Sequence, residues 1–230
     1  MFRRSWKSKM TSSERQRGWV FFALYLLVFP YLNSWAQRVL LGEGEPLTAE
    51  ANVVYYSLLF VLALMVFWSF LKSDFEDLLD WLPENLFGLL AGFAGAGILH
   101  FLVGFLPLPV ADPIPAQYAA EFALAPLPTA VLVLVLIPVI EEALFRGLVF
   151  GSLRRYSRVL AYVVTILGYA LACVWRYAIE LGDPRYLLLT VCYLPMSAAL
   201  TWCYDNGGSI WGSVGLHTAI NAFVLALALH

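Results

Sequence analysis

The chain has 230 residues, of which 61% are hydrophobic and only 13% are charged, and its formal net charge is −2. A soluble domain of this length needs polar residues to cover its outside, and this composition does not provide enough of them. We therefore exclude a soluble globular protein and predict an integral membrane protein.

The first 17 residues form a basic segment that we expect on the cytoplasmic side. It contains six basic residues and a single acidic one, Glu14. Cytoplasmic loops of membrane proteins carry an excess of Lys and Arg. A second basic cluster, Arg154, Arg155 and Arg158, follows the fourth apolar run, and counting spans from a cytoplasmic N-terminus also places this cluster inside. The two charge signals thus predict the same topology.

Residues 18–230 are predicted to form one all-α transmembrane domain with about seven helices. Each apolar run is long enough for a membrane-spanning helix, and the strict alternation of a β-barrel is absent. No internal repeat or second domain is evident. The predicted spans are Trp19–Ala36, Asn52–Leu71, Leu86–Leu106, Pro128–Ser152, Val159–Ile179, Tyr186–Tyr204 and Ile210–Leu229.

Prolines and cysteines complete the outline of the fold. The connection 106–128 is rich in proline, which predicts irregular chain with a short helix over 116–124. The cysteines Cys173, Cys192 and Cys203 lie in or beside apolar runs and show no CxxC spacing. We expect small buried thiols, neither a disulfide framework nor a zinc site.

The fourth span carries the strongest functional signal, two adjacent carboxylates followed by an arginine. A charge in the middle of a bilayer costs about 2.5–3.5 kcal/mol on insertion scales, so it indicates function. Glu142 and Arg146 share one helical face and can pair. Glu141 points roughly 100° away around the axis, where it has no local partner. The spacing therefore predicts a structural Glu142–Arg146 pair and a reactive Glu141 that serves as general base or acid.

The last span carries a second polar stripe. His217 and Asn221 also lie on one helical face. An imidazole can hold a water molecule or shuttle a proton, and an amide can donate to an oxyanion. Each residue alone is more often a packing residue between helices, and a buried structural salt-bridge set is the alternative for the Glu pair. Together the two spans favour a catalytic site.

These two motifs resemble those of the CAAX-protease and bacteriocin-processing (CPBP) intramembrane endopeptidases. The double Glu with Arg is matched by Glu141, Glu142 and Arg146, and the final His with Asn by His217 and Asn221. The resemblance covers residues 129–223, which we take as the catalytic core. It implies that Glu141 activates water for peptide hydrolysis, that Glu142 pairs with Arg146, that His217 helps to hold the water and that Asn221 steadies the oxyanion.

The sequence differs from the family at one motif. Between the two matched motifs, the family has an aromatic residue followed four positions later by His. Here Tyr169 and Cys173 stand at those positions. Either Cys173 substitutes within the site, or the activity is reduced or altered. Only Glu141 and His217 remain as evident metal ligands, whereas catalytic zinc usually has three from the protein. We therefore expect a metal-independent, glutamate-type mechanism without a cofactor, with zinc as the open alternative.

The sequence thus predicts an intramembrane endopeptidase, of a bacterial plasma membrane, with its site toward the cytoplasmic half. Its partners would be the lipid bilayer and a membrane-embedded or lipidated protein or peptide substrate, and we expect no nucleic-acid partner. A non-catalytic binding or immunity protein of the same fold is the alternative. A proton-coupled transporter is a third hypothesis, although the inverted repeats typical of transporters are not evident.

Overall fold

The structure is a computed structural model that describes residues 9–41 and 49–229. The first eight residues of the predicted basic segment lie outside the described part. All regular elements of the described residues are helical. In chain order they are α1 (Ser12–Leu27), α2 (Phe29–Leu41), α3 (Ala49–Asp80), α4 (Leu82–Val103), α5 (Pro113–Leu124), α6 (Pro126–Val131), η1 (Leu132–Leu136), α7 (Ile137–Glu142), η2 (Ala143–Phe150), α8 (Gly151–Arg154), α9 (Arg158–Glu180), η3 (Pro184–Leu189), α10 (Thr190–Gly207) and α11 (Ile210–Ala228).

The predicted helical membrane bundle is confirmed, but the described residues contain six candidate spans where the sequence predicts seven. These six are α3, α4, the run α6–α8, α9, the run from η3 to α10, and α11. The predicted first span, Trp19–Ala36, is divided between α1 and α2, because the helix is interrupted at Val28. Pro30 at the second position of α2 explains this break, since proline is tolerated in the first turn of a helix but not in its interior.

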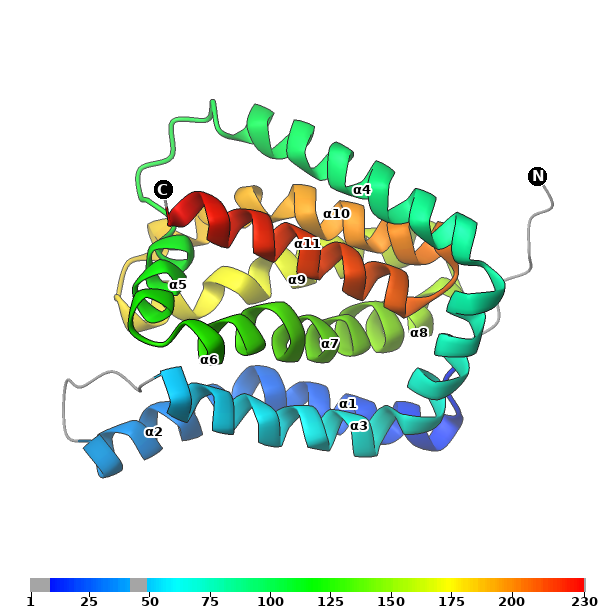
Figure 1. The fold of residues 1–230 in the computed structure, drawn as a ribbon, viewed down its shortest axis with the longest axis horizontal. Helices are drawn as coiled ribbons and strands as arrows, with labels where there is room; N and C mark the ends of the chain where they lie inside the picture. Colours follow the sequence, from blue (N-terminus) through cyan, green and yellow to red (C-terminus); the bar gives the residue numbers. More distant parts are fainter. Residues whose placement is uncertain (1–8, 42–48, 230) are drawn as a thin grey trace.

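The continuous run α6–α8, over Pro126–Arg154, is the central helix of the bundle. It is 61% buried, whereas the other spans are at most 39% buried. Figure 1 shows it between the layer of α1, α2 and α3 and the layer of α9, α10 and α11, with α4 on the outside. A helix in this position has neighbours all round, so charges within it are removed from lipid.

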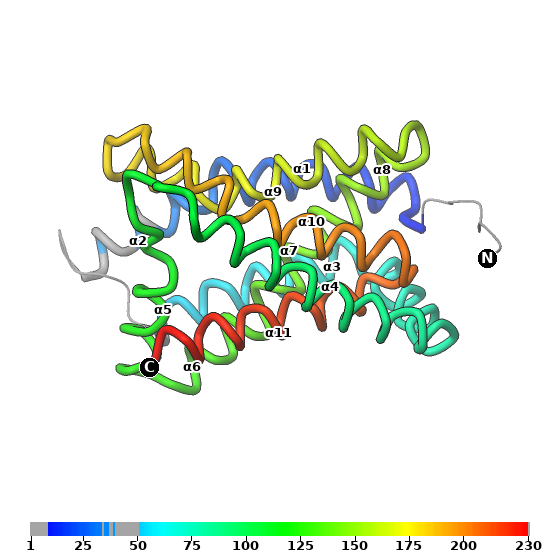
Figure 2. Tube along the Cα trace, turned by 90° about the horizontal axis from the view of Figure 1, so that it is seen from above, coloured from blue at the N-terminus to red at the C-terminus, as the bar shows by residue number. Residues whose placement is uncertain are grey.

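The two ends of the bundle differ in character. The described N-terminus and α8 lie at one end, which we call the basic end, and α5 and the C-terminus lie at the other in both views (Figures 1 and 2). At the basic end, Asp205 pairs with Arg154 at 2.8 Å and with Arg158 at 2.7 Å. Lys9 pairs with Asp74 and, at 2.7 Å, with Asp77. The first set ties α8, α9 and α10 together, and the second fastens the segment before α1 to α3.

Two sections of the central helix are π-helical, η1 and η2, and they flank Glu141 and Glu142. A π-helix bonds each amide to the carbonyl five residues back, and such segments are frequent at functional sites. Pro138 supplies no N–H, so it cannot donate to the carbonyl of Leu134, as in an α-turn, or to that of Val133, as in a π-turn. Side chains of α11 take over both acceptors: Thr218 donates to Leu134 O at 2.8 Å and Asn221 to Val133 O at 2.9 Å. The missing proline donor therefore docks α11 on the central helix.

Two glycines of α4, Gly88 and Gly92, lie close to neighbouring helices. A Cβ atom added to Gly92 would lie 2.6 Å from Leu216 Cδ2, and one added to Gly88 would lie 3.2 Å from Cys203 Sγ. Gly95 and Gly97 have no described atom within 4 Å of such a Cβ. Small residues thus let α4 pack closely on α10 and α11 along only one side.

Candidate active site

The predicted Glu142–Arg146 pair is present and fully buried. Arg146 Nη1 lies 3.0 Å from Glu142 Oε1, and neither side chain is exposed. The guanidinium also donates through Nη2 to the carbonyl and the hydroxyl of Ser197 on α10, both at 3.2 Å. On its face lies the ring of Tyr169, 4.3 Å from Cζ to the ring centroid. A buried charge needs such partners, because its desolvation is otherwise not offset.

His217 joins the pair from α11. Its Nδ1 lies 2.9 Å from Glu142 Oε1, and the imidazole is buried. The carboxylate accepts, so Nδ1 carries the proton and Nε2 is left as the acceptor in the neutral ring. Tyr169 OH lies 3.5 Å from Nε2, on the side that faces Glu141. Glu142 thus fixes both the orientation and the tautomer of the imidazole.

Glu141 lies on the other side of His217, next to a cavity. Its Oε2 is 4.0 Å from His217 Nε2, and its side chain is 20% exposed. Helical spacing predicts that Glu141 has no local partner, and a partner comes from another helix: Tyr25 of α1 donates to Oε1 at 3.2 Å. This partner is 116 positions away along the chain, so helical spacing did not indicate it. The Oε2 atom is left facing His217.

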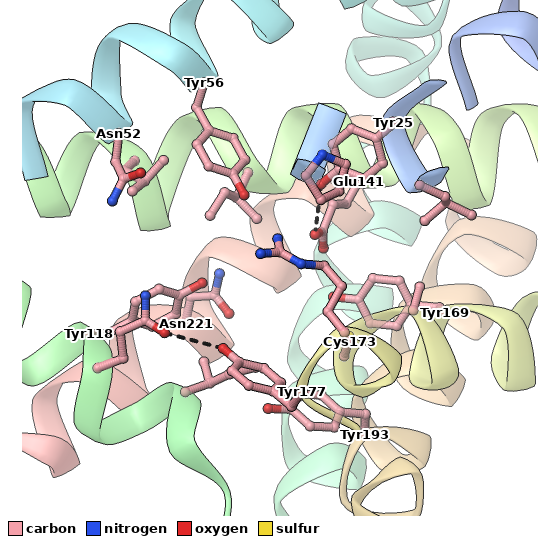
Figure 3. A pocket seen from close by; sticks show the side chains of 18 of the residues that line it. Tyr25, Asn52, Tyr56, Tyr118, Glu141, Tyr169, Cys173, Tyr177, Tyr193 and Asn221 are labelled. Atoms are coloured by element: carbon pink, nitrogen blue, oxygen red, sulfur yellow. Dashed lines mark hydrogen bonds between the residues drawn. The ribbon is translucent and has the colours of Figure 1, made fainter. Parts of the chain in front are cut away.

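Tyr169 and Cys173 stand where the family has its aromatic residue and its histidine. Both line the same cavity as Glu141, His217 and Asn221. Figure 3 shows Cys173 one turn beyond Tyr169 on α9, with Glu141 on the opposite wall. Asn221 is also present at the cavity, but one of its two amide N–H groups is used by Val133 O. The structure thus brings together every residue that the sequence analysis singled out.

The cavity has a volume of about 320 Å³ and a lining that mixes polar and apolar side chains. Tyrosine hydroxyls are prominent, among them Tyr25, Tyr56, Tyr118, Tyr177 and Tyr193 (Figure 3). Amides and charged groups from α3, α5 and α9 add Asn52, Gln117, Glu121 and Arg176. Such groups can pair with the backbone of an unwound peptide, which a purely apolar pocket could not do.

The donor set fits a resident metal ion poorly. No group of three or more His, Cys, Asp or Glu residues that could hold an ion occurs among the described residues. Glu142 Oε1, which lies closest to the imidazole, is already shared between Arg146 and His217. Glu141 and His217 alone would give two ligands, fewer than the three that catalytic zinc sites usually have.

Comparison with known families bears on this site directly. Residues 123–223 match the family model described as type II CAAX prenyl endopeptidase Rce1-like. This segment is thus similar to the Rce1-like family. The recognition made from the two motifs is thereby confirmed, and since this is a protease family, the match supports a peptidase. Neither a curated protein sequence nor a solved structure matches the chain.

The Rce1-like segment contains the Glu pair, Arg146, His217 and Asn221, but it leaves out α1 to α4. Three contacts of the site were missed by sequence reasoning. Tyr25 lies outside the matched segment, and Ser197 and Thr218 are unremarkable polar residues in apolar runs. For Thr218 a signal existed: it follows His217 on the last span and faces the carbonyls that Pro138 leaves without a donor.

Proposed function

We propose that this protein is an intramembrane endopeptidase in which Glu141 activates a water molecule for attack on a peptide bond. The observation that carries the proposal is the 4.0 Å separation between Glu141 Oε2 and His217 Nε2. It is too long for a direct hydrogen bond, yet one water molecule can bond to both atoms at about 2.8 Å each. The cavity beside these atoms has room for a peptide.

In the proposed reaction, Glu141 takes a proton from the water while the oxygen attacks the scissile carbonyl carbon. His217 Nε2 accepts the second hydrogen bond of the water and so directs its lone pair. The tetrahedral intermediate collapses when the C–N bond breaks and protonated Glu141 returns its proton to the leaving amine. The products are a new carboxylic acid and a new amine, and transfer of the acid proton to the amine gives a carboxylate and an ammonium group.

Glu142, Arg146 and Asn221 would support this chemistry in different ways. The buried Glu142–Arg146 pair holds His217 in the tautomer that leaves Nε2 free to accept. The second N–H of the Asn221 amide, which Val133 does not use, is the proposed donor to the oxyanion. A hydrogen bond of this kind acts strongly where water is excluded.

The substrate that fits a membrane-embedded site is a membrane-associated or lipidated protein or peptide. Membranes of cells that express the wild-type chain should contain a shortened protein that is full-length in cells expressing Glu141→Ala at equal level. An unchanged fragment pattern in that variant would reject the role of Glu141. We place the protein in a bacterial plasma membrane with its N-terminus in the cytoplasm.

A non-catalytic membrane binding or immunity protein is the second candidate, and Cys173 at the position of the family histidine favours it. The Glu141→Gln variant distinguishes the two candidate functions, because glutamine keeps the size and hydrogen bonding of the side chain but cannot take a proton from water. If the biological effect survives this neutral substitution, a binding role is supported instead of hydrolysis.

A further inference from the structure

The cavity extends from Glu141 in one direction only. Its lining comes from the first turns of α3 with Asn52 and Tyr56, from α5 with Gln117 and Tyr118, and from the last turn of α9 with Tyr177. These segments all lie toward the end of the bundle that holds α5 and the C-terminus (Figures 1 and 2). Figure 3 shows Tyr118 and Tyr177 on the side away from Tyr25 and Glu141.

Toward the basic end, packed side chains fill the bundle beyond Glu141. Leu144 and Leu148, which follow it on the central helix, have no exposed surface, and Phe67 and Phe70 on α3 are at most 1% exposed. The packing is tight: a Cβ added to Gly147 would lie 2.7 Å from Phe70 and 2.9 Å from Met10. In the described part of the chain, the site is thus closed toward the basic end.

The charges of the two ends decide which one faces the cytoplasm. The basic end holds Lys9, Arg15, Arg17, Lys72, Arg154, Arg155 and Arg158 of the described residues. Among the residues whose side chains the structure describes, the helices at the cavity end contribute Arg176 and Arg185. Acidic residues contribute little to orientation, so the bias of Lys and Arg places the basic end in the cytoplasm.

We propose that the active site is entered from the extracytoplasmic side, so that the substrate is a peptide segment presented at that face of the membrane. This inference rests on the proposed function and narrows it. It differs from the sequence-based prediction of a site toward the cytoplasmic half, because a cavity that opens there and a cytoplasmic N-terminus require opposite orientations of the bundle. A cytoplasmic C-terminal tail would not reach Glu141.

The lining of the cavity suits such a segment. A membrane-anchored chain must unwind to expose a peptide bond, and its freed N–H and C=O groups then need partners. Tyr56, Tyr118 and Tyr177 offer hydroxyls, and Asn52 and Gln117 offer amides along the path to Glu141. The expected substrate is therefore an extended stretch beside a membrane anchor, on the extracytoplasmic side.

Cysteine accessibility tests the orientation without a substrate. In a chain with all three native cysteines replaced by alanine, Gln117→Cys marks the exposed rim of the cavity and Ser13→Cys marks the exposed start of α1. A membrane-impermeant maleimide should label Gln117→Cys in right-side-out vesicles and Ser13→Cys only in inverted vesicles. The reverse pattern, or labelling of both from one side, would overturn the proposal.

The path to the site is tested with native Cys173, which lines the cavity. With Cys192 and Cys203 replaced by alanine, a small charged thiosulfonate should modify Cys173 faster from the outside of right-side-out vesicles than in inverted ones. Faster modification in inverted vesicles would contradict the proposed entry. Cys173 in the Glu141→Gln variant should be modified at the same rates, so this result does not depend on catalysis. A Glu141→Ala variant that still cleaves would reject the proposed function but would leave the proposed side of entry unaffected.

Discussion

At the scale of single residues, the two adjacent carboxylates of the site have different surroundings and different proposed roles. Glu142 is fully buried between Arg146 and His217, whereas Glu141 keeps one oxygen toward the cavity and receives Tyr25 on the other. The spacing of four residues between Glu142 and Arg146 predicts their pairing, because both lie on one helix. The partner of Glu141 comes from α1, and no local pattern predicts a contact between helices so distant in sequence.

Replacement of Glu142 should destabilise the fold. In Glu142→Gln, the buried Arg146 loses its counter-charge, and breaking a buried pair in this way costs about 3–5 kcal/mol. We expect a clearly lower midpoint of thermal unfolding in detergent, followed by circular dichroism. The matched control, Glu141→Gln, should unfold near the wild-type temperature, because Glu141 faces the cavity and its amide replacement still accepts from Tyr25. Equal midpoints for the two variants would contradict the assignment.

Tyr25 is a positioning residue, and its loss should affect turnover more than binding. Tyr25→Phe removes the hydroxyl that donates to Glu141 Oε1 and keeps the ring. We expect kcat to fall about tenfold, as for the loss of one hydrogen bond worth about 1.4 kcal/mol, with KM nearly unchanged. Tyr31→Phe, on the exposed face of α2, is the control and should leave both constants as they are. A change in KM alone would instead assign Tyr25 to substrate binding.

Metal dependence can be tested on the same site. Since the described residues offer no three-ligand cluster, cleavage should continue after dialysis against EDTA and 1,10-phenanthroline. We expect less than a twofold loss of rate, measured against the same preparation with added zinc. Loss of cleavage on chelation and its recovery with zinc would reject the metal-independent glutamate mechanism.

At the scale of elements, one proline shapes the central helix. Pro138 withholds a donor from Leu134 and Val133, and Thr218 and Asn221 replace it from α11. The long apolar run predicts the helix itself, and its proline predicts a disturbance. Neither predicts the π-helical turns or the partner helix, because these depend on which side chains of α11 happen to face the freed carbonyls.

Thr218 therefore matters for docking α11. Thr218→Val keeps the shape of the side chain but leaves the Leu134 carbonyl without its donor, at a cost of about 1–3 kcal/mol. We expect a lower thermal midpoint and a reduced rate, since His217 and Asn221 are carried by the same helix. Thr218→Ser, which keeps the hydroxyl, should behave like the wild type. If Thr218→Val and Thr218→Ser have the same thermal midpoint, the hydroxyl contributes nothing to the docking of α11.

At the scale of the whole molecule, composition and apolar runs predict a helical membrane bundle, and the structure confirms it. Six spans are formed by runs long enough to cross a membrane alone, whereas the predicted span Trp19–Ala36 is divided at Val28 between two shorter helices. The convergence of the two motifs on one cavity needed the family resemblance or coordinates, because nothing in the spacing of Glu141 and His217 fixes how their helices pack. The direction in which the cavity extends is visible only in the assembled bundle.

The central claim is that Glu141 takes a proton from water at a site formed by Glu142, Arg146 and His217. The most direct measurement is the cleavage rate of a substrate, identified as the shortened membrane protein, by purified enzyme in liposomes. We expect Glu141→Gln to be folded, with a wild-type thermal midpoint, and to cleave at least a hundredfold more slowly. A folded Glu141→Gln variant that cleaves at the wild-type rate would contradict it.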